Sequence, residues 1–307
     1  MSRSCIKSRA LASYLGLAIG DALGATTEFM LPREIRSGYG VHRNLIGGGW
    51  LRLKPGQITD DTGMSLALGE SLLEAGGMDL NKVALKFISW MRSKPVDIGD
   101  TVRRGLQRVI ATGKLEAEYS EYAAGNGAAM RNLPVILATL SDADTFSGWS
   151  LSQSHITHHH PESDTGVLIL GDLTRRAILE GQSAPLRSLA KEWVARFPRF
   201  DYQQNKGETS GYIVHTVKNV LDFFFNTADF ESCLIGIVNR GGDADTNGAM
   251  AGMLAGAFYG LDSIPGRWLN RLDPKVREAI ELQVESLMEM FPLLLEVENP
   301  GEIIPSQ

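Results

Sequence analysis

The sequence predicts an all-α protein, and three observations support this fold class. Apolar residues recur at helical spacing in one segment after another; in 79–93, Val83, Phe87 and Ile88 fall on one face. Alternation of apolar and polar residues, the pattern of a half-buried strand, is hard to find. Late in the chain, glycines recur every four residues and therefore share one helix face, at positions 248, 252, 256 and 260.

The predicted helices follow one another with short connections. Gly76 and Gly77 end one of them, Asp100 is placed as the N-cap of another, and Pro161 suits the first position of a third. The glycine stripe weakens its own helix, which makes sense where another backbone must approach closely. We expect helices at about 8–25, 62–75, 79–93, 99–112, 127–140, 163–181, 184–197, 209–225, 229–240, 246–260 and 274–291.

Bulk composition narrows the class of protein. A chain of 307 residues with 43% apolar residues forms one large domain or two small ones. The net charge is −6 and the basic residues are scattered, which argues against nucleic-acid binding. Two cysteines, Cys5 and Cys233, cannot form a disulfide framework, so we expect a cytoplasmic protein.

The N-terminal segment resembles a secretory signal, because basic residues precede the apolar run 10–20. Against that interpretation, Gly16, Gly20 and Gly24 repeat the spacing of the late glycine stripe. We therefore expect a core helix here. The late apolar stretch is shorter than the roughly 20 residues that a bilayer span needs, so no transmembrane segment is expected.

Two pairs of carboxylates stand at predicted helix starts. Asp243 and Asp245 follow two glycines, and Asp60 and Asp61 open the helix predicted at 62–75. Glu28 follows another glycine-bearing segment. A structural alternative makes Asp245 a helix N-cap and Asp243 a solvated neighbour. If these carboxylates converge, their repulsion requires cations, and oxygen ligands without cysteine suit Mg²⁺ or Mn²⁺ rather than zinc.

Gly125-Asn126-Gly127 forms a glycine-bearing turn before a predicted helix. Free backbone amides at a helix N-terminus bind anions, so we interpret this turn as a candidate phosphate site. An ordinary Asn-Gly turn is the structural alternative. The chain has no Gly-Lys-Ser/Thr sequence, which argues against P-loop handling of nucleoside triphosphates.

The histidine-rich stretch 155–160 and the loop at 94–101 supply further candidates. His155 and His158 could serve in a metal site, in proton transfer or in hydrogen bonding to a ligand; a solvated cluster is the structural alternative, and zinc is disfavoured. In the loop, Asp100 is assigned to a helix cap. Asp97 has no such structural role, so we predict that it acts in catalysis.

Taken together, these segments resemble the ADP-ribosylglycohydrolase family. The motifs that carry the resemblance occur in the family's order over about residues 10–265: Gly16-x₃-Gly-Asp-Ala-Leu-Gly24 with Glu28, Thr59-Asp-Asp-Thr62, Pro95-x-Asp-Ile-Gly99, Gly125-Asn-Gly-Ala-Ala-Met-Arg131, the His155/His158 region, Ser210-Gly-Tyr212 and Gly241-Gly-Asp-Ala-Asp-Thr-Asn-Gly248. The resemblance implies a compact helical fold with a central binuclear metal cleft, in one domain over 1–307. We expect the tail from about 292 to be loosely ordered.

The resemblance also implies roles for individual residues. Two divalent cations, Mn²⁺ or Mg²⁺, would be bound by Glu28, Thr59, Asp60, Asp61, Asp243, Asp245 and Thr246. The turn with Asn126 and Gly127 would face a diphosphate, His155 and His158 would line the ribose and phosphate groove, and Tyr212 would offer its ring to adenine. Asp97 would act as general acid or base, or in a path through an opened ribose ring.

The implied activity is removal of ADP-ribose from a modified arginine of a protein by metal-assisted cleavage of the N-glycosidic bond. The resemblance is strongest to members that act on the nitrogenase iron protein (dinitrogenase reductase), and these imply a PII-type signalling partner and peripheral association with the inner membrane. Two alternatives remain at this stage. They are a metal-dependent phosphoesterase acting on ADP-ribose-like diphosphates, and a non-catalytic ADP-ribose-binding relative; the intact set of metal ligands argues against the second.

Overall fold

The structure, a computed structural model, describes residues 2–291, and all of its named secondary-structure elements are helices. Within these residues the only extended pairings are two isolated antiparallel bridges, Gly48 with Leu53 and Gly125 with Tyr212. The all-α prediction is confirmed. The tail from 292, expected to be loosely ordered, lies outside the described residues.

The α-helices are α1 (Arg3–Gly24), α2 (Pro32–Tyr39), α3 (Asp60–Ala75), α4 (Leu80–Arg92), α5 (Asp100–Thr112), α6 (Leu133–Ala138), α7 (Ala143–Ser154), α8 (Pro161–Glu180), α9 (Ser183–Arg196), α10 (Ile213–Asn226), α11 (Phe230–Val238), α12 (Ala244–Tyr259), α13 (Gly266–Leu269) and α14 (Pro274–Met290). Short 3₁₀ helices interrupt the loops at Glu121–Ala123, Pro198–Phe200, Tyr202–Gln204 and Leu261–Ser263.

Most predicted helices are present, but three features differ from the prediction. Helices α2, α7 and α13 were not expected from the sequence. The segment 209–212 is not helical, and the helix predicted at 127–140 shortens to α6. Pro134 explains the shortening, because a proline inside a longer helix would clash with the carbonyl four residues earlier. Residues 126–132 form successive turns instead.

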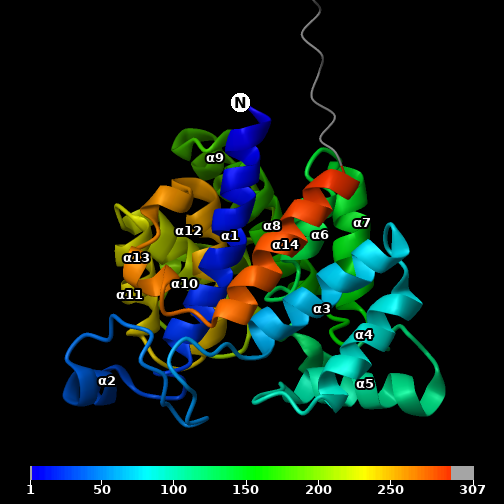
Figure 1. The fold of residues 1–307 in the computed structure, drawn as a ribbon, viewed down its shortest axis with the longest axis horizontal. Coiled ribbons are helices and arrows are strands. Elements are labelled where there is room, and N and C mark those ends of the chain that lie inside the picture. The colour runs from blue at the N-terminus through cyan, green and yellow to red at the C-terminus, as the bar shows by residue number, and fades with distance from the viewer. Residues whose placement is uncertain (1, 292–307) are drawn as a thin grey trace, which may run out of the picture.

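Helices α1 and α12 form the centre of the molecule (Figure 1), with α3 and α14 against α1 and with α8, α10 and α11 against α12. The two central helices cross where their glycines meet. A β-carbon on Gly20 would lie 1.9 Å from the carbonyl oxygen of Gly248, and one on Gly16 would lie 2.1 Å from that of Gly252. The glycine stripes therefore permit direct backbone contact, as their spacing indicated.

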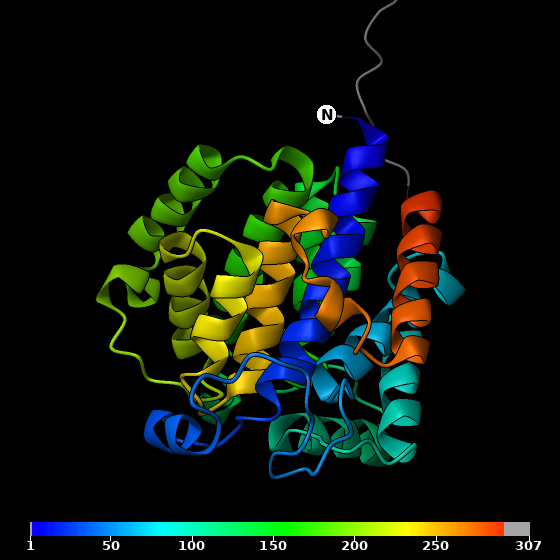
Figure 2. The same cartoon turned by 60° about the vertical axis from the view of Figure 1, so that its left-hand side comes forward.

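The central pair is antiparallel, and this orientation positions the functional residues. Gly24 of α1 faces Ala244 of α12, so the C-terminal end of α1 lies beside the N-terminal end of α12. Figure 2 shows the two helices side by side from a second direction. Both ends carry acidic motifs, and the crossing brings these motifs together. No helix within 2–291 has the length and apolar character that crossing a membrane would require.

Candidate functional site

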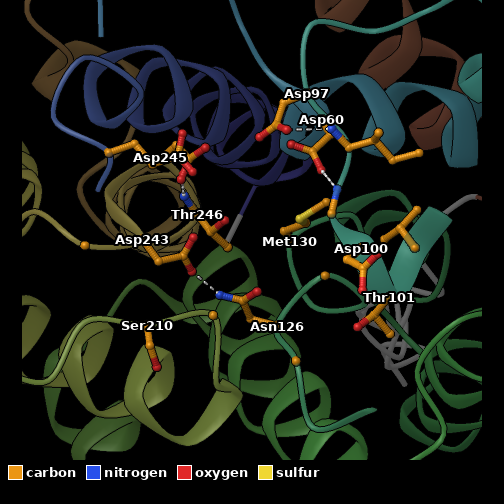
Figure 3. A pocket seen from close by; sticks show the side chains of 18 of the residues that line it. Asp60, Asp97, Asp100, Thr101, Asn126, Met130, Ser210, Asp243, Asp245 and Thr246 are labelled. Carbon is orange, nitrogen blue, oxygen red and sulfur yellow. Dashed lines mark hydrogen bonds between the residues drawn. The ribbon is translucent and has the colours of Figure 1, made fainter. Parts of the chain in front are cut away.

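A cleft of about 520 Å³ opens where the C-terminal end of α1 meets the N-terminal ends of α3, α5 and α12. Among residues 2–291, its lining contains acidic side chains but no lysine or arginine (Figure 3). The residues that line it are Glu28, Phe29, Trp50, Asp60, Asp97, Ile98, Gly99, Asp100, Thr101, Val102, Gly125, Asn126, Gly127, Met130, His158, Thr209, Ser210, Gly211, Gly242, Asp243, Asp245 and Thr246.

Two backbone hydrogen bonds join the segment after α1 to the loop before α12. Phe29 donates its N–H to the carbonyl of Gly242 at 2.7 Å, and Gly242 donates to the carbonyl of Met30 at 3.0 Å. Gly241 and Gly242 have φ values of 68° and 62°, which glycine adopts without strain. A β-carbon on Gly241 would lie 1.9 Å from the carbonyl oxygen of Met30. This contact places Glu28 opposite the acidic pair of α12.

The start of α3 is held by a carboxylate from α1. Asp21 is fully buried, and its Oδ2 accepts the backbone N–H of Thr62 at 3.1 Å and the hydroxyl of the same residue. It accepts the N–H and the hydroxyl of Thr59 as well. Asp21 therefore replaces a local N-cap for α3 and orients Asp60 and Asp61, which begin that helix.

The carboxylates of the cleft fall into two groups that share Asp245. Oxygen atoms of Glu28, Asp243 and Asp245 lie within 4.8 Å of one another, and so do those of Asp60, Asp97 and Asp245. Each group offers three hard oxygen ligands: the first draws them from two segments of the chain and the second from three. Such a donor set fits Mg²⁺ or Mn²⁺.

Asp61 and Thr59 contact the site without lining the cleft. One oxygen of Asp61, Oδ2, accepts hydrogen bonds from the hydroxyls of Thr59 at 3.3 Å and Thr246 at 3.4 Å. The other, Oδ1, is buried and has no hydrogen-bond partner. An unpartnered buried carboxylate oxygen is costly, and a cation beside it would remove that cost. The carboxylates of this site therefore fit a metal centre.

Crowding and burial change the acidity of the site. Burial, reinforced by the neighbouring acids, raises the pKa of Glu28 to about 8 and that of Asp60 to about 7. The same causes hold the pKa of Asp61 and Asp245 well above the ordinary range, and burial also raises the pKa of Asp243. Without cations, a pKa of about 8 keeps Glu28 protonated at neutral pH, and a pKa of about 7 leaves Asp60 partly protonated.

Asp97 lies in the loop before α5 and reaches the second carboxylate group. Its Oδ1 accepts the backbone N–H of Ile98 at 2.7 Å. Asp100, assigned to the N-cap of α5 from the sequence, is instead the first residue of the helix, and its carboxylate pairs with Arg104 at 3.2 Å. The cap position belongs to Gly99, whose N–H approaches Asp60 Oδ2 at 3.3 Å.

The turn at 125–127 lines the cleft, but not as the start of a helix. The amide of Asn126 donates to Asp243 and to the hydroxyl of Thr216, so this side chain holds a carboxylate in place. Gly127 lies against His158: a β-carbon there would lie 2.9 Å from Cε1 of that ring. The expected helix N-terminus behind the turn was wrong, since α6 begins only at Leu133.

The two predicted histidines separate in the structure. His158 is buried at the cleft, where burial and the nearby Arg131 lower its pKa to about 3, so its imidazole is neutral. His155 does not reach the cleft. Its ring lies between Glu116 at 3.4 Å and Asp164 at 3.0 Å and lines a separate cavity. The short spacing in sequence hid this difference: His155 caps the C-terminal end of α7, whereas His158 lies after the turn that follows the helix.

Tyr212 lies beside the cleft rather than in it. Its hydroxyl donates to Glu162 at 2.6 Å, and its ring lines an adjoining hollow. That hollow shares Thr101, Gly125 and Gly211 with the cleft, so a long ligand in the cleft could extend to this ring.

Three further residues of the site were not predicted from the sequence. Asp21 was noted only for its position, although a carboxylate within an otherwise apolar helix segment was a usable indication. Trp50 donates its indole N–H to Glu28 at 2.6 Å, and Phe29 packs beside it with ring centroids 5.3 Å apart. Nothing in the glycine-rich loop before Trp50 indicated that contact.

A helical fold around a carboxylate-lined cleft is the arrangement that the sequence motifs implied. The family model described as ADP-ribosylglycohydrolase matches residues 2–296. The chain belongs to this family. As an ADP-ribosylglycohydrolase, it has the helical fold and the acidic cleft that its motifs predicted.

Similar proteins include other ADP-ribosylglycohydrolases. The chain is 51% identical over 293 residues to ADP-ribosyl-[dinitrogen reductase] glycohydrolase of Rhodospirillum rubrum, covering 95% of this chain and 100% of that protein. It is 33% identical to ADP-ribosylarginine hydrolase Tri1 of Serratia proteamaculans (strain 568), covering 92% of this chain and 80% of the relative. A solved structure described as an ADP-ribosylglycohydrolase-related protein complex superposes with a TM-score of 0.84 at 35% identity, covering 94% of this chain and 99% of that one.

Proposed function

We propose that this protein removes ADP-ribose from a modified arginine side chain of a protein, with dinitrogenase reductase as its target. The carboxylate-lined cleft carries this proposal, together with the names of the two relatives, which refer to dinitrogen reductase and to ADP-ribosylarginine. The reaction is hydrolysis of the bond between the anomeric carbon of ribose and a guanidine nitrogen. A PII-type partner and association with the inner membrane through such a partner belong to the same proposal and rest on the sequence resemblance.

Two divalent cations, Mn²⁺ or Mg²⁺, fit the two carboxylate groups. We assign Glu28 and Asp243 to one ion, Asp60 to the other, and Asp245 to both, with Asp61, Thr59 and Thr246 completing the set. Such ions lower the pKa of bound water and hold ribose hydroxyls. The unpartnered Oδ1 of Asp61 supports this assignment.

The remaining cleft residues would bind and orient the substrate. His158, neutral and beside the 125–127 turn, is suited to hydrogen bonding with a phosphate or ribose oxygen rather than to carrying a charge. Asn126 keeps Asp243 in place, and the Tyr212 ring offers a surface for adenine at the adjoining hollow. Asp97 would transfer a proton to the departing guanidine or from the attacking water.

The test is incubation with arginine-linked and serine-linked ADP-ribosylated proteins, with and without Mn²⁺, followed by mass analysis of protein and product. We expect release of intact ADP-ribose from the arginine-linked substrate and dependence on the metal. Asp60→Asn, Asp245→Asn and the double variant should lose both metal and activity. Release of AMP instead would favour a phosphoesterase, and binding without any product would favour a non-catalytic relative.

A further inference from the structure

Large exposed hydrophobic side chains are concentrated in one segment of the chain, which reaches the cleft through Phe29 and Trp50. Thirteen such side chains are exposed among residues 2–291, and six of them lie within the short span 29–50, so the concentration is local. The six are Phe29, Leu31, Tyr39, Val41, Ile46 and Trp50. A soluble protein rarely exposes a cluster of this kind without a binding role.

Phe29 and Trp50 connect this cluster to the cleft, because both also line it. Phe29 is 66% exposed and Trp50 is 52% exposed. Phe29 also has a φ of 60°, a conformation that any residue with a β-carbon adopts at a cost. Its N–H bond to Gly242 and its ring contact with Trp50 maintain this conformation. The fold thus holds an aromatic side chain outward at the mouth of the cleft.

The same span is cationic in a protein of net charge −6. From 29 to 54 it carries one carboxylate, Glu34, which accepts the N–H of Leu31. It also carries five exposed cations, none within 4.0 Å of a carboxylate belonging to residues 2–291. These cations are Arg33, Arg36, Arg43, Arg52 and Lys54. A partner that complements this surface therefore presents apolar side chains surrounded by negatively charged ones.

We propose that the 29–54 surface docks an acidic face of the substrate protein around its modified arginine. The inference rests on the proposed function. When an ADP-ribose group occupies the cleft, the arginine that carries it sits at the mouth, and the surface around that arginine must face the cleft edge. Phe29 and Trp50 are the residues that such a surface meets first. The aromatic and arginine side chains here are those that dominate protein–protein binding energy.

The experiment compares two arginine-linked substrates with the Mn²⁺-loaded enzyme. One is ADP-ribosylated dinitrogenase reductase, a protein large enough to contact the 29–54 surface. The other is ADP-ribosylagmatine, a small molecule that is too short to contact it. The variants avoid the cleft lining: Leu31→Ser with Ile46→Ser removes apolar contact, and Arg36→Glu reverses a charge. Position 31 is the N-cap of α2, where serine is favourable, so we expect the variant to fold. Matched controls are Leu85→Ser with Leu282→Ser, exposed on α4 and α14, and Lys191→Glu on α9.

We expect kcat/KM for the protein substrate to fall about tenfold or more in the docking variants and to stay parental in the controls. Activity on ADP-ribosylagmatine should be unchanged in every variant. Added salt should weaken turnover of the protein substrate only, because charge attraction between surfaces is screened.

Equal losses on both substrates, or no loss on either, would overturn the docking inference while leaving the hydrolase activity in place. A parental enzyme that cleaves neither substrate would overturn the proposed function and the docking inference with it. Sedimentation with phosphatidylglycerol vesicles that is abolished by Arg36→Glu, combined with unchanged protein turnover, would instead assign this surface to an anionic membrane.

Discussion

Asp21 Oδ1 accepts both the backbone N–H and the hydroxyl of Thr59, at 3.0 and 2.9 Å, across the interface between α1 and the start of α3. This contact couples the central helix to the segment that carries Asp60 and Asp61. A buried carboxylate that orients ligand-bearing residues acts on metal affinity without touching the ion.

Asp21→Asn should therefore weaken metal binding. The amide of asparagine cannot accept from all the donors around it, and each buried donor left unpaired costs about 1–3 kcal/mol. We expect Mn²⁺ affinity to fall about 10–100-fold and the Tm to drop. Calorimetric titration and thermal unfolding measure both. Asp79→Ala is the control, because Asp79 caps α4 away from the cleft and the loss of this cap should cost stability alone. Parental Mn²⁺ affinity in Asp21→Asn would contradict the coupling.

Stability of the metal-free protein should fall as pH rises. The folded-state pKa values of Glu28 and Asp60 lie at about 8 and about 7, above the ordinary values of 4.5 and 3.8. The native state thus binds more protons than the unfolded state, and this part of its stability is lost between about pH 4 and pH 8. Urea unfolding with chelator at pH 5, 6.5 and 8 measures the trend. Mn²⁺ at pH 8 should reverse it, and chelated protein that grows more stable over this range would contradict the prediction.

Gly20→Ala should disrupt the central crossing. Its β-carbon would lie 1.9 Å from the carbonyl oxygen of Gly248, a backbone atom that can move only if the two helices separate. Overpacking of this kind costs about 1–3 kcal/mol or more, and the separation would also displace the acidic ends. We expect a lower Tm and weaker Mn²⁺ binding. Gly148→Ala is the matched control, since this helical glycine on α7 has nothing within 4 Å and the change should stabilise the helix. Equal stability of the two variants would mean that the backbones of α1 and α12 leave room for a β-carbon at position 20.

The features that could be predicted from sequence were those with a local pattern. Glycines four residues apart indicated that another backbone approaches α12 closely, although not that this backbone is α1. Paired carboxylates at helix starts indicated the acidic cleft. The contact of Asp21 with Thr59 could not be predicted, because it joins residues 38 positions apart through a fold not yet known. His155 was misplaced for a similar reason. Its position in sequence gives no sign of Glu116 and Asp164, which hold it outside the cleft.

Two roles must be distinguished for Asp97, metal binding and proton transfer. It reaches the carboxylate group of Asp60 and Asp245, which makes metal binding one possible role. Yet it lies on a loop, and its Oδ1 is already used by the N–H of Ile98. We predict that it acts as general acid or base and that the other carboxylates suffice to hold the ions.

Asp97→Asn keeps the size of the side chain and removes proton transfer, so turnover should fall about 10²–10⁴-fold. Metal content and Tm should stay near parental, because the substitution replaces only one carboxylate oxygen of the site by an amide nitrogen. Single-turnover cleavage of an arginine-linked substrate, metal analysis and thermal unfolding on one sample separate the roles. Asp100→Asn is the control, since Asp100 lines the same cleft but pairs with Arg104, and its rate should stay near parental. If Asp97→Asn loses its metal, Asp97 is a ligand; if it stays loaded and cleaves at the parental rate, the proton is transferred by another group.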